Sequence, residues 1–133
     1  MKRIIYIIIC LLGMNVMQAQ DIKERIQVQT DKEFFQFVDM AHGYRAMMIT
    51  LQNYVRRHGC RTMVGIIKRY APPSENNTSA YLAYVCNEMG VPTTYEPDLE
   101  DKATLCALVS AMSRMENGVD ADPEEVEAGW RIV

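Results

Sequence analysis

Residues 39–59 read DMAHGYRAMMITLQNYVRRHG, and their apolar side chains recur at spacings of three and four residues. This spacing places them on one face of a helix; the residues concerned are Met40, Tyr44, Met47, Met48, Leu51, Tyr54 and Val55. Asp39 is a suitable N-cap, the basic residues 56–58 suit the negative end of the helix dipole, and Gly59 is a typical stop. We therefore expect one long helix whose apolar face lies in the core.

Four shorter helices are expected after it. They run from 62 to 70, around the apolar stripe 81–89, around the stripe 105–112, and from 122 to 130. Pro72 ends the first because proline bars the residue before it from helical dihedrals. Gly90 closes the second, and Pro123 fits the first position of the last helix. The sequence therefore predicts a mainly α, compact single domain.

The region before the long helix has two features. Lys2 and Arg3 precede an apolar run over residues 4–13, and the following stretch 14–19 ends in the small residue Ala19. This is the pattern of a secretory signal peptide, and the run is shorter than the roughly 20 apolar residues that span a bilayer. We expect a signal peptide over residues 1–19 and a single domain over 20–133. The protein is then exported, periplasmic or secreted, without stable membrane insertion after cleavage.

A short β segment is expected near the N-terminus of the mature chain. The stretch 32–38 carries Phe34, Phe35 and Phe37, and two of these rings share one face of an extended segment. Ile22, Ile26 and Val28 fit neither period cleanly. We therefore expect a strand at the Phe run, and the stretch before it is a lead-in that can hold a second short strand.

Composition excludes one class of partner. The chain has 133 residues, of which 49% are hydrophobic and 23% charged, and its pI is about 5.4. The signal segment holds two of the 14 basic residues and none of the 17 acidic ones, so the mature chain carries a net charge of −5. A chain with this net negative charge does not bind phosphate groups electrostatically, so we expect no nucleic-acid partner.

Cysteine and histidine positions predict no metal site or cofactor. Cys60, Cys86 and Cys106 remain after cleavage, and Cys86 and Cys106 lie on apolar stripes. Burial in the core and a Cys86–Cys106 disulfide are both compatible with this placement. The two histidines show no paired spacing with cysteine. The sequence also lacks a glycine-rich phosphate loop and a serine elbow.

The densest polar cluster follows a stiff proline corner, in Pro72-Pro73-Ser74-Glu75-Asn76-Asn77-Thr78. Asn or Thr side chains here can cap the next helix by accepting hydrogen bonds from its free N–H groups. The same amides can instead face a ligand, with the Tyr81 ring one turn on available to pack against a sugar. The candidate ligand-binding residues are therefore Asn76, Asn77 and Tyr81.

Hydrolysis of a glycoside requires a carboxylic acid beside the scissile oxygen. Three carboxylates lie where solvation can be poor: Glu33 before the Phe run, Glu75 at the corner, and Glu116 before Asn117-Gly118. Each of them is also compatible with a solvated or capping role.

Three runs of sequence resemble a known family. They are Phe34-x-x-Phe37 with Ala41-x-Gly43-Tyr44-Arg45-Ala46-Met47 and Leu51-x-x-Tyr54; the stretch from Thr62 through Arg69-Tyr70-Ala71-Pro72-Pro73-Ser74-Glu75-Asn76-Asn77-Thr78 to Val85; and the tail 105–118. Together they resemble a phage-derived family of virion structural proteins related to lysozyme-like murein hydrolases. The asparagine-rich segment and the Trp-x-Gly that such proteins carry ahead of the Phe block are missing between Gln20 and Glu33.

The resemblance implies a lysozyme-like helical fold that handles peptidoglycan glycan strands. Glu75 matches the family motif by position and is the catalytic candidate. Two functions follow as hypotheses. One is an exported envelope protein that binds glycan, with weak or lost hydrolase activity. The alternative is a non-catalytic, phage-derived structural or interaction protein.

Overall fold

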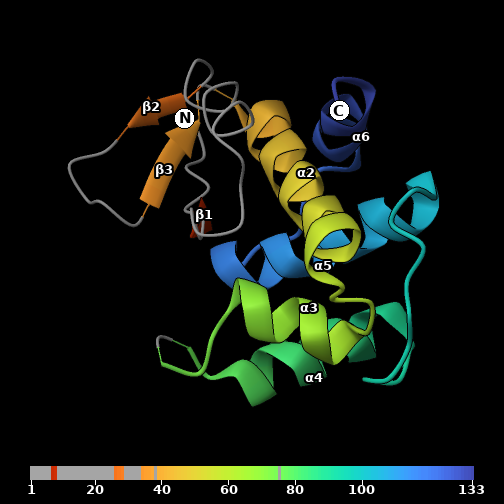
Figure 1. Ribbon diagram of the computed structural model, residues 1–133. Helices are drawn as coiled ribbons and strands as arrows, with labels where there is room; N and C mark the ends of the chain where they lie inside the picture. The colour runs from red at the N-terminus through yellow and green to blue at the C-terminus, as the bar shows by residue number, and fades with distance from the viewer. Residues whose placement is uncertain (1–6, 9–25, 29–33, 38, 75) are drawn as a thin grey trace.

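The computed structural model describes residues 7–8, 26–28, 34–37, 39–74 and 76–133, with side chains for 39–74 and 76–133. Its helices are α2 (Met40–His58), α3 (Met63–Tyr70), α4 (Thr78–Met89), α5 (Lys102–Asn117) and α6 (Pro123–Arg131). Its strands are β1 (Ile7–Ile8), β2 (Ile26–Val28) and β3 (Phe34–Phe37). The described chain is therefore mainly α, as expected (Figure 1).

The strands form an antiparallel sheet in the order β1-β3-β2. β2 pairs with β3 so that Val28 lies opposite Phe35, and β1 pairs with β3 so that Ile8 lies opposite Phe34. β3 occupies the Phe run for which the sequence predicts a strand. Apart from β1, residues 1–19 lie outside the described residues, so the signal peptide stays a prediction.

α2 begins and ends as its sequence indicates. The Asp39 side chain accepts a hydrogen bond from the His42 N–H, and Gly59 closes the helix in the left-handed conformation at φ 63°. The expected apolar face is confirmed, since the side chains of Met47, Met48 and Leu51 are fully buried. α2 is the longest described helix, yet neither it nor any other described helix is long and apolar enough to cross a membrane.

α6 packs along α2 at very short range (Figure 1). A Cβ atom on Gly129 of α6 would lie 2.8 Å from the Cβ of Tyr44 and 2.9 Å from the carbonyl oxygen of Ala41. Only a residue without a side chain therefore fits at the crossing. Val126, also on α6, is buried in the core.

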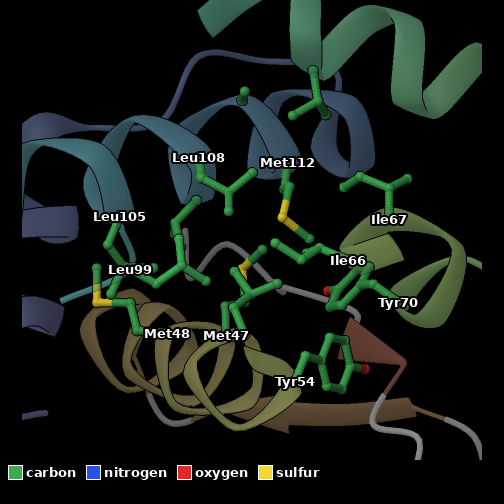
Figure 2. Packing of buried hydrophobic residues seen from close by; sticks show 14 of the residues in the cluster. Met47, Met48, Tyr54, Ile66, Ile67, Tyr70, Leu99, Leu105, Leu108 and Met112 are labelled. Atoms are coloured by element: carbon green, nitrogen blue, oxygen red, sulfur yellow. The ribbon is translucent and has the colours of Figure 1, made fainter. Parts of the chain in front are cut away.

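α5 crosses the molecule between α2 on one side and the pair α3 and α4 on the other (Figure 1). Figure 2 shows Met47 and Met48 of α2 facing side chains of α5 across the core. Those α5 residues are Leu105, Leu108 and Met112, all fully buried. A lysozyme-like arrangement, expected from the resemblance, is not established by this packing and stays a prediction.

The loop that follows α4 closes the N-terminus of α3. The free N–H groups of Met63 and Val64 donate to the carbonyl oxygens of Tyr95 and Thr93, at 2.9 and 3.0 Å. Thr62 caps the same helix by accepting from the Gly65 N–H at 3.2 Å. The first N–H groups of a helix have no partner within it, so these bonds replace water and fix the loop on α3.

The three described cysteines are free thiols. Cys86 on α4 is buried in the core, while Cys106 on α5 is half-buried and faces α6. The two thiols therefore point into different parts of the molecule, and the alternative of a Cys86–Cys106 disulfide is wrong. Core burial is confirmed for Cys86 and holds in part for Cys106.

Replacement of Gly129 by Ala tests the crossing of α2 and α6. The new methyl group meets backbone that cannot move aside, so we expect a loss of about 2 kcal/mol in the free energy of unfolding, measured by urea denaturation. Gly65→Ala is the matched control, because this helical glycine has only the Thr62 hydroxyl within 3.4 Å. A loss in G65A equal to that in G129A would contradict the proposed close approach.

Candidate functional site

The proline corner uses its polar side chains to join α3 to α4. The Asn77 side chain caps α4 by accepting from the Ala80 N–H at 3.2 Å. The Thr78 hydroxyl donates to the carbonyl of Ala71, and the Asn76 amide donates to the carbonyl of Pro72 at 3.5 Å. Capping by Asn77 is therefore confirmed. Glycan contact by Asn76 and Asn77 stays a prediction.

Tyr81 lies inside the protein, at 6% exposure. Its ring centroid is 6.3 Å from that of Tyr70, with the planes tilted by 55°. Its position on the apolar stripe of α4 agrees with this burial, and contact of the ring with a sugar stays a prediction. The proposed catalytic Glu75 lies outside the described residues, so its role stays a prediction.

Glu116, in the last turn of α5, meets both of these tyrosines. Tyr70 ends α3 and Tyr81 lies in α4, so three helices bring the groups together. The two phenol oxygens and the Oε2 atom of Glu116 are buried, and none of them has a hydrogen-bond partner of good geometry. Buried polar groups without partners are costly. We call Tyr70, Tyr81 and Glu116 the tyrosine–carboxyl cluster.

Burial has a strong effect on the acid–base properties of this cluster. It raises the pKa of Glu116 to about 7, and the hydroxyls of Tyr70 and Tyr81 limit the rise because they stabilise the carboxylate. Burial also raises the pKa of both tyrosines, and the nearby Glu116 charge adds to this. Around neutral pH the cluster therefore contains a carboxyl group that can hold or release a proton, between two neutral phenols.

The cluster continues toward α2 through Tyr54. The Tyr54 side chain contributes to the raised pKa of Tyr70. The Arg69 guanidinium lies 5.3 Å from the centroid of the Tyr54 ring. Figure 2 shows the Tyr54 and Tyr70 rings close together at the edge of the core. The Arg69 charge thus lies over an aromatic face, a favourable cation–π geometry.

The sequence indicated part of this cluster. Glu116 was among the carboxylates expected to be poorly solvated, but its position before Asn117-Gly118 marked a helix end and nothing more. The spacing of Tyr70 and Tyr81 carries no signal that both hydroxyls reach Glu116, because that meeting depends on how three helices pack.

His42 stabilises the beginning of α2. Its Nδ1 atom lies 2.8 Å from Oδ1 of Asp39, the N-cap of the helix.

Among the side chains that the structure describes, no group of three histidine, cysteine or acidic residues is arranged to hold a metal ion.

An open groove of about 490 Å³ runs between α5 and α6. Its walls are small or apolar and come from both helices: Ala103, Cys106, Ala107, Ser110, Pro123 and Val126. Charged residues complete the lining, namely Asp101 and the pair Lys102–Glu127, whose Nζ and Oε1 atoms are 2.6 Å apart. We call this feature the α5–α6 groove. The sequence carries no indication of this groove, because small residues on an exposed helix face produce no periodic signal.

Comparison with known proteins shows a relation to a phage protein. The chain is 38% identical over 92 residues to Protein P5 of Pseudoalteromonas phage PM2. The match covers 69% of this chain and 56% of Protein P5, so the chain spans about half the length of the curated relative. No family model matches the chain. The relation to a phage protein is therefore confirmed, while a relation to lysozyme-like hydrolases is not shown.

Glu116→Gln tests the effect of the buried carboxyl on stability. The pKa is about 7 in the folded chain against an ordinary 4.5, so the folded state holds the proton more tightly. The contribution of Glu116 to the free energy of unfolding therefore falls as pH rises from about 4.5 to 7, by about 3 kcal/mol in total. We expect E116Q to lack this decline and to be the more stable protein at pH 8.

Urea denaturation at pH 4, 6 and 8 measures this difference. Glu127→Gln is the control, since Glu127 is only partly buried and the hydrogen bond from Lys102 lowers its pKa, so its removal gives no gain at pH 8. Parallel pH profiles for the wild type and E116Q would show that Glu116 is solvated.

Replacement of Asn77 by Ala tests whether its side chain stabilises the protein by capping α4. Loss of the cap leaves the Ala80 N–H without its partner, and we expect a decrease of about 1 kcal/mol in the free energy of unfolding. Thermal denaturation of N77A measures this, with Asn77→Asp as the variant that keeps an acceptor. An unchanged Tm in N77A would mean that the side chain is free to face a ligand.

Proposed function

We propose that this chain is a non-catalytic, phage-type structural or interaction protein that acts in exported form. The observation that carries the proposal is the α5–α6 groove, an open surface between two helices with small apolar walls and charges at its rim. Surfaces of this composition accept side chains of a protein partner more readily than polar sugar. The identity to a phage protein supports a role of this kind.

The polar corner also favours this proposal over catalysis. The Asn76 and Asn77 amides bond to backbone of their own segment, and the Tyr81 ring is buried. The two amides therefore stabilise the corner and the start of α4, and the Tyr81 ring is packed in the core. A partner that docks elsewhere leaves this corner undisturbed.

Cleavage of peptidoglycan glycan strands is the second candidate function, because the Glu116 carboxyl holds a proton near neutral pH, as a general acid must. Glycosidases of the common type add a second carboxylate roughly 5–10 Å away. Apart from burial, only the hydroxyls of Tyr70 and Tyr81 shift the pKa of Glu116. The described residues thus supply an acid but no second carboxylate beside it.

An assay on purified murein sacculi separates the two functions. We expect the full chain to leave the turbidity of a sacculus suspension unchanged at pH 5, 6 and 7. A decline in turbidity that disappears in Glu116→Gln and persists in Glu127→Gln would establish hydrolysis and contradict the proposal. Co-sedimentation of the chain with sacculi, measured in the same samples, reports glycan binding without turnover.

A further inference from the structure

Charge is divided unevenly between two parts of the fold. Residues 40–74, which form α2, α3 and their connection, contain six arginine and lysine residues and no acidic residue. Residues 76–133, which include α4 to α6, contain eleven acidic residues and only three basic ones. A single chain therefore offers a cationic and an anionic surface, the arrangement that favours association of unlike faces.

The cationic surface is concentrated where α2 passes into α3. Arg57, Arg61 and Lys68 are exposed there, and none of them makes an ion pair with another described residue. Their neighbour Arg56 is different, because it donates two hydrogen bonds to the carboxylate of Glu100 at 2.8 and 2.6 Å. We call Arg57, Arg61 and Lys68 the basic end.

The α5–α6 groove has the complementary character. Asp101 and Glu127 lie in its lining and the exposed Glu124 follows the wall residue Pro123. Its lysine, Lys102, is paired with Glu127, which Arg131 also contacts at 3.3 Å, so the negative charge of the rim comes from Asp101 and Glu124. Between these charges the exposed alanines Ala103 and Ala107 leave room for incoming side chains. The groove thus combines an apolar floor with an acidic rim.

We propose that the α5–α6 groove binds the basic end of a second copy of this chain. The inference rests on the proposed function, which it deepens by naming the partner. Because the two surfaces differ, each copy uses its groove for one neighbour and its basic end for another. Such head-to-tail contacts build rings or filaments, the form that a structural component takes.

Sedimentation velocity of the full chain over a range of concentrations tests the proposal, at 50 and 500 mM NaCl. We expect reversible self-association that weakens at the higher salt concentration, because the rim charges are exposed and screened. Arg61→Glu, which reverses one charge of the basic end, and Ala107→Trp, which fills the groove, should each weaken association at least about tenfold. Ala83→Glu, at an exposed position of α4, adds negative charge elsewhere and should associate like the wild type.

A mixture of the two variants gives the sharpest result. R61E keeps an intact groove and A107W keeps an intact basic end, so an equimolar mixture should form a 1:1 dimer and nothing larger. Circular dichroism and thermal denaturation show that both variants are folded. A chain that is monomeric at all concentrations, or a mixture that stays monomeric while the wild type associates, would overturn the docking proposed here. Either result would leave the proposed non-catalytic function standing, because that function is tested separately by the murein assay.

Discussion

Burial of α2 on several sides is the constraint on which the rest of the structure depends. It packs against both α5 and α6, and the polar side chains of Thr50, Gln52 and Asn53 are buried as well. The Gln52 amide donates to the carbonyl of Leu99 at 3.1 Å, whereas the buried Thr50 hydroxyl has no hydrogen-bond partner among the described residues. The segment before α5 is therefore held against α2 by a specific hydrogen bond as well as by the burial of Leu99.

The crossing of α2 and α6 leaves no space for a side chain at the point of contact. Gly129 lets two backbones approach at a distance that excludes even a methyl group. The same crossing sets the position of α6 relative to α5, since α5 also packs on both helices. The α5–α6 groove is thus a consequence of where α2 holds α6.

The same packing buries the polar groups of the tyrosine–carboxyl cluster, which is unfavourable in free energy. Three helices converge at Glu116, and the apolar surroundings that stabilise the core remove water from its carboxyl group. The protein accepts buried polar atoms without partners at this point, and such groups are exceptions in folded proteins. Related phage proteins are the natural place to look for the same three side chains.

Local signals were enough to predict the helices of this protein. Periodicity, caps at Asp39 and Thr62, and stops at Gly59 and Gly90 depend on neighbours within a few residues, and the structure agrees with all of them. The candidate site could not be predicted in the same way, because Tyr81 lies on an apolar stripe whose residues can pack in the core or face a ligand. Its burial, its meeting with Tyr70 and Glu116, and the groove beside Ala107 were settled by the tertiary structure alone. The reason is physical: these features join residues from different helices, and the direction in which one helix crosses another is set by the summed packing of all of them.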